Sequence, residues 1–249
     1  MHTARHAGQN GKSFSSYRER PEEGRIKNDL STVAAFFDFD GTVFRGRSGF
    51  VLVKETLKRR RLAFLDYLRL AERALAYLAG SRSQRATIET VAIALRDWPE
   101  SNAEELGSRL ADQYLSHRIY TEARQLLRMH RDLGHRLVFV SAATRYLVVP
   151  VAETLGVSDV ICTRLQVTHG RLTGRVLHPT CWHRGKLVAV RTFSAQEGID
   201  LARSFYYGDG LEDLPLFEAV GHPRPVNPER ALRRLAAQRG WPVSRSPDS

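Results

Sequence analysis

The most constraining segment of the sequence is an apolar run over residues 34–37 that leads into Asp38 and Asp40 and turns at Gly41. Because residues i and i+2 of a strand lie on the same side, both carboxylates are expected to converge at the carboxyl end of a buried strand. Open α/β sheets hold their ligands at that end, and two acids there suit a nucleophile, a metal ligand and an acid/base group. An ordinary strand-to-turn junction is the alternative interpretation, since Asp and Gly are common turn residues.

A calcium-binding loop does not fit the spacing of these acids. An EF-hand loop requires glycine at position six and glutamate at position twelve, whereas counting from Asp38 places a glycine at position four and Gly49 at position twelve. The segment before Asp38 is also typical of a strand, where an EF-hand requires a helix.

Composition places the chain among globular proteins. Its 249 residues are 42% hydrophobic, which is enough for a sizeable core in one large domain or two smaller ones. The most apolar helical stretch, residues 62–79, is interrupted by charged side chains and does not qualify as a transmembrane span. The first thirty residues lack the apolar segment of a secretory signal, and two cysteines, Cys162 and Cys181, provide no disulfide framework. A reduced, cytoplasmic protein is therefore expected.

The formal net charge of +11 favours anionic partners, including phosphate esters. Most arginines alternate with acids, as on ordinary solvated helix faces, and the one dense cluster in the sequence is Lys58-Arg59-Arg60-Arg61. Charge that is spread in this way leads us to expect no specific nucleic-acid partner.

The order of apolar patterns predicts an α/β fold. Residues 1–30 have few large apolar side chains and are expected to form a disordered tail, with a second short tail over residues 241–249. Residues 48–118 show helical periodicity and no strand signal, which predicts an all-helical cap inserted after the first motif. The remaining segments, 31–47 and 119–240, are expected to form a Rossmann-like core.

Periodicity and turn residues locate the individual elements of this core. Strands are expected over residues 33–38, 135–140, 160–163, 204–207 and 223–226, with a small hairpin over residues 165–167 and 171–176. Helices are expected over residues 121–133, 144–155, 184–197, 213–220 and 228–239. Strands that alternate with helices imply a mainly parallel sheet covered on both faces.

Within the expected cap, apolar residues recur along one helix face. These residues are Phe64, Leu68, Ala71, Leu75 and Leu78. We expect this face to pack against neighbouring cap helices, and contact with an anionic membrane beside the basic residues 58–61 is the alternative. Capping-box patterns at residues 81–84 and 101–104 predict that new helices start there.

Three further segments place polar residues at strand ends or helix starts. Ser141 stands between a strand and a helix, so its hydroxyl and the neighbouring amides suit an anion. Lys186 stands at a helix start, where an ordinary surface lysine is the alternative. Residues 208–213 lead from a strand into a helix and carry Asp209 and Asp213, which an acidic first helical turn also explains.

With these four segments in order, the chain resembles the haloacid dehalogenase-like (HAD) superfamily and is most similar to subfamily IB, its phosphoserine-phosphatase-like branch. The family pattern is D-x-D-G-T/S, a hydrophobic strand ending in Ser or Thr, a lysine, and then G-D-x-x-x-D, with a helical cap inserted after the first motif. All four motifs are present, and the resemblance covers residues 33–239. Phosphoserine phosphatases usually carry asparagine before the last aspartate, whereas Glu212 stands there, so the resemblance does not name the substrate.

The resemblance implies how phosphate chemistry would be divided among these side chains. Asp38 would be the nucleophile that forms an aspartyl-phosphate, and Asp40 would protonate the leaving oxygen and then activate water. The phosphate-binding residues would be Thr42, Ser141 and Lys186.

Mg²⁺ is the implied cofactor, bound by Asp38, the backbone carbonyl of Asp40, Asp209 and Asp213. The expected function is that of a Mg²⁺-dependent phosphoric monoester hydrolase, an HAD-type phosphatase acting on a small phosphorylated metabolite. One alternative is a lysophospholipid phosphatase at a membrane surface, with weak contact through residues 58–61. The other is a non-catalytic basic protein that binds anionic lipid or nucleic acid. The oligomeric state does not follow from the sequence.

Overall fold

The computed structural model describes residues 32–59, 63–78 and 84–246. The expected tail over residues 1–30 lies outside this part of the chain, as do Arg60 and Arg61 of the basic cluster and the first three residues of the capping box at 81–84. None of the helices within the described ranges is long and apolar enough to cross a membrane.

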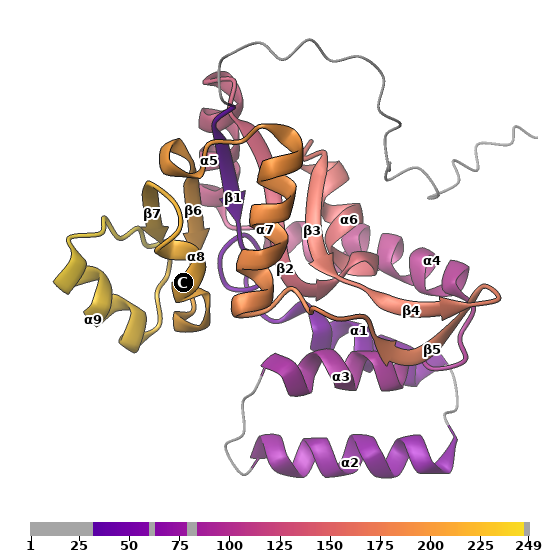
Figure 1. Ribbon diagram of the computed structural model, residues 1–249. Coiled ribbons are helices and arrows are strands. Elements are labelled where there is room, and N and C mark those ends of the chain that lie inside the picture. The colour runs from indigo at the N-terminus through magenta and orange to yellow at the C-terminus, as the bar shows by residue number, and fades with distance from the viewer. Residues whose placement is uncertain (1–31, 60–62, 79–83, 247–249) are drawn as a thin grey trace, which may run out of the picture. The chain divides into compact units, whose positions relative to one another are not determined.

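A five-stranded sheet forms the centre of the fold (Figure 1). Its strands pair in parallel, in the order β3-β2-β1-β6-β7. Their bounds are β1 Ala34–Phe37, β2 Arg136–Thr144, β3 Asp159–Thr163, β6 Phe205–Gly208 and β7 His222–Pro225. The strand order changes direction between β1 and β6, and sheets of this kind bind ligands at the carboxyl ends of the strands next to such a switch point.

Helices cover both faces of this sheet. Ala35 and Phe37 of β1 belong to one apolar cluster, together with side chains of α5 and α6. Ala34 and Phe36 belong to a second cluster, together with side chains of α7, α8 and α9. The bounds of these helices are α5 Thr121–Asp132, α6 Arg145–Thr154, α7 Arg184–Glu197, α8 Leu214–Phe217 and α9 Arg230–Arg239. Because both faces of β1 are covered, the strand is apolar without interruption, and the expected α/β fold class is confirmed.

In the chain, further helices follow β1 and precede α5, where the cap was expected (Figure 1). They are α1 Ser48–Arg59, α2 Phe64–Leu78, α3 Gln84–Ala94 and α4 Glu100–Leu110, followed by a π-helix over Ala111–Leu115 and a 3₁₀ turn over Ser116–Arg118. The expected hairpin forms from β4 (Leu165–Thr168) and β5 (Arg171–Val176), and β5 contacts α3. The helical insert therefore shares its packing with a hairpin that comes from the later part of the chain.

Helix α4 is packed very closely on α6. A β-carbon added to Gly107 would lie 1.7 Å from the backbone oxygen of Tyr146, closer than two non-bonded atoms approach. Glycine is required at this position because it has no side chain, and its presence brings the cap helix directly onto the core.

Two elements of the core differ from those expected by more than one or two residues. β2 continues past Ser141 to Thr144, because its pairing with β3 resumes there after a register shift. The helix expected over residues 213–220 is instead a 3₁₀ turn, Leu211–Asp213, followed by the short α8. Pro215 in the first turn of α8 explains the division, since proline fits the start of a helix and not its interior.

A new helix starts beside the capping-box pattern at residues 101–104, but two residues earlier than the pattern predicts and without its side-chain cap. α4 begins at Glu100 with Pro99 as its N-cap, so Ser101 already lies in the first turn. The backbone N–H of Glu100 donates to the carbonyl of Gly170 in the hairpin turn at 2.9 Å. A tertiary contact thus satisfies one of the backbone donors at the start of α4.

Helix α2 turns toward the other cap helices the side opposite to the one expected. Large exposed fractions of 74%, 51% and 67% are found for Phe64, Leu68 and Leu75. The expectation that this face packs on neighbouring cap helices is therefore wrong for these side chains. Asp66 is instead buried, and its Oδ1 lies 3.7 Å from Nε of Arg96. A buried carboxylate requires cationic or hydrogen-bonding partners. The contact of Asp66 with Arg96 therefore determines which side of α2 faces inward.

The end of the chain packs on the core as far as it is described. The ring of Trp241 stacks on Phe217 with centroids 5.6 Å apart, and Ser244 pairs with Val226. Residues 241–246 of the expected second tail are therefore part of the packed structure.

Candidate active site

The carboxyl ends of β1, β2 and β6 bring the predicted site residues to one edge of the sheet. Asp38 follows β1, and its backbone N–H donates to the carbonyl of Tyr207 in β6 at 2.8 Å. Ser141 lies in β2, Asp209 follows β6, and Lys186 lies in the first turn of α7. The site therefore forms beside the switch point between β1 and β6.

Lys186 is the buried cation of this site. Its ammonium group donates to Oδ1 of Asp38 at 2.8 Å, to Oδ2 of Asp213 at 2.6 Å and to the hydroxyl of Tyr206 at 3.2 Å. Only 2% of the residue is exposed, so it is not an ordinary surface lysine. Burial alone would lower the pKa of Lys186, but the charges of Asp213 and Asp38 hold it above its usual value.

Asp38 lies among more negative than positive charge. Burial raises the pKa of Asp38 to about 7, because the opposing charge of Lys186 is partly cancelled by Asp213 and Asp40. An attacking carboxylate must be ionised, so any further positive charge at this point favours the reactive form of Asp38.

Asp40 points toward the start of the cap. The backbone N–H of Ser48, the first residue of α1, donates to its Oδ1 at 2.9 Å. Burial raises the pKa of Asp40 to about 6, while the bond from Ser48 and the charge of Arg47 limit the rise. A carboxyl group that titrates near neutral pH both donates and accepts protons there, which is the requirement for a general acid and base.

Gly41 allows the loop after β1 to pass directly over Asp209. The φ angle of Gly41 is 85°, and a β-carbon added there would lie 2.1 Å from Oδ2 of Asp209. Both the backbone conformation and the close approach require glycine. Burial raises the pKa of Asp209 well above its usual value, and Asp38 adds to the rise. The charge of Asp38, which follows β1, thus acts on the acid that follows β6.

Hydroxyl groups lie at the ends of β1 and β2. The Oγ atom of Ser141 accepts a hydrogen bond from the backbone N–H of Ala143 at 3.0 Å. The hydroxyls of Thr42 and Thr144 are buried and have no hydrogen-bond partner among the described residues. Buried hydroxyls without partners are costly, and an anion bound at the strand ends would satisfy them.

The oxygen atoms around Asp38 suit Mg²⁺. Oδ1 of Asp213 is buried without a hydrogen-bond partner in the described part of the chain, and the charge of Asp38 raises the pKa of Asp209. Within the same ranges, no three acidic, imidazole or thiol side chains are grouped as a metal cluster. Mg²⁺ does not require such a cluster, because it binds through one or two carboxylates and keeps several waters. The residues present therefore fit this ion.

Glu212 adds negative charge at the edge of the site. Its carboxylate lies over Gly210, where an added β-carbon would be 2.3 Å from Oε2. After burial and Asp38, Glu212 is the next cause of the raised pKa of Asp209. Glu212, which stands where phosphoserine phosphatases usually carry asparagine, therefore raises the pKa of Asp209.

Sequence reasoning missed Tyr206 and Ser48. The hydroxyl of Tyr206 donates to Oδ2 of Asp213 and lies beside Lys186, and burial raises its pKa well above the usual value. A tyrosine in a buried strand requires a partner for its hydroxyl, and that signal was present in the sequence. Ser48 contributes through its backbone amide, which no residue type identifies, since most residues at a helix start offer the same donor.

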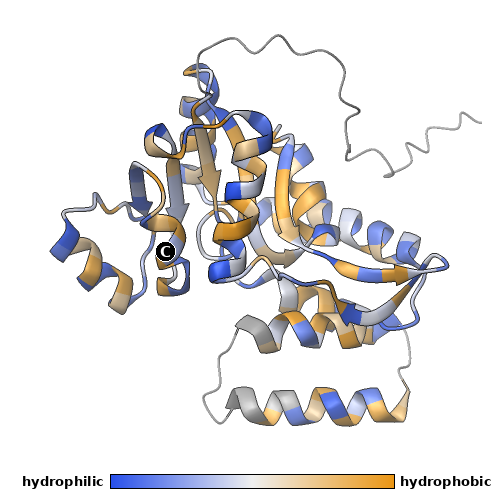
Figure 2. Cartoon of the chain, in the orientation of Figure 1, coloured by the Kyte–Doolittle hydropathy of each residue, from blue (hydrophilic) through white to orange (hydrophobic). Residues whose placement is uncertain are grey.

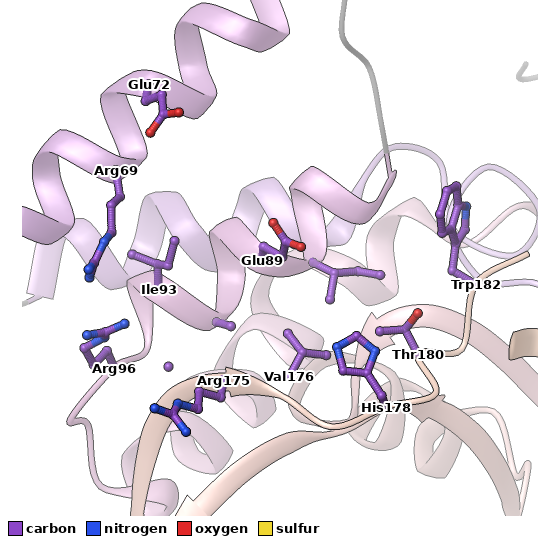
Figure 3. A pocket seen from close by; sticks show the side chains of 13 residues that line it. Arg69, Glu72, Glu89, Ile93, Arg96, Arg175, Val176, His178, Thr180 and Trp182 are labelled. Atoms are coloured by element: carbon purple, nitrogen blue, oxygen red, sulfur yellow. The ribbon is translucent and has the colours of Figure 1, made fainter.

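A small cavity lies between the strand ends and the cap, and a larger cleft lies between the cap helices and the hairpin. The cavity has a volume of about 20 Å³ and is lined by Asp40, Thr144 and residues of α1 and α3. The cleft has a volume of about 720 Å³ and is lined by α2, α3, β5 and the segment that leads to α7 (Figure 3). Ile88 of α3 lines both, so the cleft adjoins the cavity that contains Asp40.

Comparison with known proteins places this arrangement in a family. A model of the haloacid dehalogenase-like hydrolase family matches residues 35–218. The inhibition of morphological differentiation protein of Streptomyces azureus is 34% identical over 225 residues, which cover 89% of this chain and 81% of that protein. Phosphoserine phosphatase SerB1 of Mycobacterium tuberculosis is 30% identical over 227 residues, which cover 85% of this chain and 70% of that protein.

A solved structure of a phospho-aspartyl intermediate analogue of phosphoserine phosphatase is similar to this chain with a TM-score of 0.61. The match covers 86% of this chain and 93% of that one, and at 19% identity it shows the fold alone. The matched family segment runs from β1 to the end of α8 and so spans all four motifs. The chain therefore belongs to the haloacid dehalogenase-like hydrolase family, as a phosphatase of its phosphoserine-phosphatase-like branch.

Proposed function

We propose that the chain is a Mg²⁺-dependent phosphoric monoester hydrolase that acts on a small phosphorylated metabolite through an aspartyl-phosphate on Asp38. The observation that carries this proposal is the buried contact of Asp38 with Lys186 at 2.8 Å, beside Asp40 with its pKa of about 6. A nucleophile, a fixed positive charge and a proton donor and acceptor then stand together at the end of one strand.

Asp38 forms and loses the covalent bond. One oxygen of its carboxylate attacks phosphorus in line with the ester oxygen, and the bond from phosphorus to that oxygen breaks as the aspartyl-phosphate forms. Lys186 favours the ionised form of Asp38 and stabilises the charge that develops on the phosphoryl oxygens. Asp213 and Tyr206 hold the ammonium group of Lys186 in this position.

Asp40 moves the proton in both half-reactions. In its neutral form it protonates the leaving ester oxygen, and as a carboxylate it takes a proton from the water that then attacks phosphorus. The second attack releases inorganic phosphate and restores Asp38. The hydrogen bond from the Ser48 amide to Oδ1 fixes the carboxyl group toward the cap, where the leaving group would lie.

Hydroxyl and backbone groups at the strand ends would bind the phosphoryl oxygens. Ser141 and Thr42 come from β2 and from the loop after β1, and both are almost fully buried. Thr144, which sequence reasoning did not select, offers a further buried hydroxyl beside Asp40. Donors fixed before substrate arrives stabilise the transition state without reorganisation.

The Mg²⁺ ion would be held by Asp38, the backbone carbonyl of Asp40 and Asp209. When bound, it supplies positive charge that lets an anionic nucleophile approach an anionic phosphate. Asp213 would support the site from one side, since its Oδ2 is already bonded to Lys186 while its Oδ1 is unpartnered among the described residues.

The space beside Asp40 favours a small ester. The cavity there is about 20 Å³ and adjoins the larger cleft of about 720 Å³. The name of the Mycobacterium tuberculosis relative makes phosphoserine one ester to test. Glu212 weighs against it, because its carboxylate near Asp209 would repel a substrate carboxylate placed there.

A screen of phosphate esters with Mg²⁺ tests the proposal, with Asp38→Asn as the blank. The substitution removes the nucleophile while preserving its shape, so turnover should fall by at least ~10³-fold. Asp132→Asn makes the same change at an exposed position at the end of α5 and should leave turnover unaltered. Near-normal turnover of folded Asp38→Asn protein would refute the assignment of Asp38 as nucleophile.

A further inference from the structure

Helix α2 carries an apolar stripe that faces away from the cap. Phe64, Leu68 and Leu75 lie on one side of the helix and are 74%, 51% and 67% exposed, and Leu65 beside them is 63% exposed. In Figure 1 helix α3 lies between α2 and the sheet, and Figure 2 shows apolar and polar residues side by side along α2. An exposed apolar stripe of this kind marks an interaction surface more often than a chance exposure.

Polar contacts on the inner side of α2 determine that the stripe points outward. Asp66 is 3% exposed, and its Oδ1 lies 3.0 Å from Arg69 and 3.7 Å from Arg96. Figure 3 shows Arg69 reaching from α2 toward Arg96, and Glu72 also lines the cleft. Rotating the helix to bury its stripe would carry Asp66 away from Arg96, while the pair with Arg69 lies within α2 and would turn with it. The outward orientation is therefore a built feature of the cap.

Basic side chains end α1, the helix that precedes α2 in the chain. Lys58 and Arg59 end α1, and their side chains are 57% and 40% exposed. Five residue steps separate Arg59 from Phe64, so their backbones lie no more than about 18 Å apart. Lys58 pairs with Glu55 at 2.6 Å, and Arg59 lies 4.0 Å from the same carboxylate, but exposed pairs of this kind contribute little in water and leave both cations able to exchange partners.

This combination of charge and apolar surface selects one class of partner. A second copy of the chain placed on the stripe would cover the apolar side chains without using the cations Lys58 and Arg59. A nucleic acid would use the arginines and lysines and would leave the aliphatic stripe exposed to water. An anionic lipid bilayer satisfies both, since its headgroups attract the cations and its acyl boundary takes the apolar side chains.

We propose that α2 docks the protein on an anionic membrane surface. Phe64, Leu68 and Leu75 enter the boundary between headgroups and acyl chains, and Lys58 and Arg59 bind the anionic headgroups. The inner side of the same helix lines the cleft that shares Ile88 with the cavity beside Asp40, so docking places this cleft close to the bilayer. The docking surface uses none of the residues assigned to catalysis and stands independently of the proposed reaction.

Co-sedimentation of the full chain with vesicles tests this surface. Vesicles of phosphatidylcholine with phosphatidylglycerol should bind at least about tenfold more protein than phosphatidylcholine alone, and high salt should release it. The double variant Leu68→Gln, Leu75→Gln should lose at least about tenfold in bound protein, and so should Lys58→Gln with Arg59→Gln. Binding that is equal for both vesicle types, or no binding at all, would overturn the proposal.

A matched control separates the stripe from exposed apolar residues in general. Leu133 is 61% exposed after α5, so Leu133→Gln makes the same chemical change at similar exposure and should leave vesicle binding unaltered. All of these variants should hydrolyse a water-soluble phosphate ester at the wild-type rate. Loss of that activity together with vesicle binding would indicate unfolding, which circular dichroism of the same samples detects.

Depth of insertion distinguishes docking by α2 from contact through charge alone. In a Phe64→Trp variant, acyl chains brominated near the headgroup should quench the new fluorescence when anionic vesicles are present. Salt-sensitive binding without quenching would overturn insertion of the stripe. A concentration-dependent dimer that Leu68→Gln with Leu75→Gln abolishes, in a chain that does not bind vesicles, would assign the stripe to a second copy instead.

Discussion

Helices α6 and α2 are held in this molecule by opposite kinds of contact. Residues 146–152 of α6 are all buried, and the helix contacts β2, β3 and α4. Among the described side chains of α2 only Asp66 is buried, while Phe64, Leu68 and Leu75 are more than half exposed. α6 is therefore held by apolar packing, and α2 by polar contacts across the cleft.

The difference separates the core, which holds the proposed catalytic groups, from α2, whose outer side is exposed. The proposed chemistry requires groups fixed within a few tenths of an ångström, and all of them lie on the strand ends and helix starts of the core. Surface contact requires a helix whose outer side is available, and α2 offers this because the core does not need its apolar face. Substitutions in the two regions should consequently have effects of very different size.

The largest effect is expected where the core meets the cap, at Asp40. Asp40→Asn removes the proton donor, so turnover of an alkyl phosphate should fall by about 10²- to 10⁴-fold. An aryl phosphate with a good leaving group should lose less, since its oxygen departs without a proton. Measured kcat values for the two esters provide the check, and equal losses for both would contradict the role of Asp40 as the acid.

A large effect on stability is expected from shortening a side chain in α6. Leu147 is 1% exposed, and Leu147→Ala would leave a cavity, so the free energy of unfolding should fall by about 2–5 kcal/mol. Urea unfolding followed by circular dichroism measures this change. A loss below about 1 kcal/mol would show that α6 is not held by apolar packing as the structure indicates.

Acid should destabilise the core through a buried histidine. Burial, with His135 and Arg224 contributing, lowers the pKa of His130 to about 4, and its Nε2 lies 2.7 Å from the Tyr207 hydroxyl. The unfolded chain binds a proton near pH 6.5, where the folded chain does not, so stability falls as pH decreases from there toward 4. The loss should reach up to about 3 kcal/mol in total.

Unfolding midpoints in urea at pH 7, 6 and 5 measure this acid sensitivity. His130→Gln keeps a polar side chain without the titration, so its stability should change less with pH than that of the wild type. Parallel curves for the two proteins would assign the acid sensitivity to other groups.

The core could be predicted from the sequence in considerable detail. The helix expected over residues 184–197 matches α7, Arg184–Glu197, and the predicted site residues lie together beside β1. Such features depend on local patterns, because a buried parallel strand is apolar throughout and its ligands gather where it ends. Tyr206 was missed although it lies within this region, since its role depends on which side chain its hydroxyl meets.

The cap was harder to predict because tertiary contacts determine its details. Ser101 carries a capping pattern, but the amide of Glu100 is satisfied by Gly170 of a hairpin that lies 70 residues later in the chain. The apolar face of α2 predicts packing, but the partners of Asp66 lie on the other side. Periodicity shows that a helix has two faces and does not show which of them its neighbours cover.

The smallest effect is expected from truncating the stripe on α2. Leu68 is 51% exposed, so Leu68→Ala should change the free energy of unfolding by no more than about 0.5 kcal/mol, and the high helix propensity of alanine limits any loss. The same urea unfolding experiment, run beside Leu147→Ala, compares leucine truncations in the two helices directly. A loss of about 2 kcal/mol or more for Leu68→Ala would mean that the stripe is covered in solution. The contrast between α6 and α2 would then fail, because both helices would be held by apolar packing.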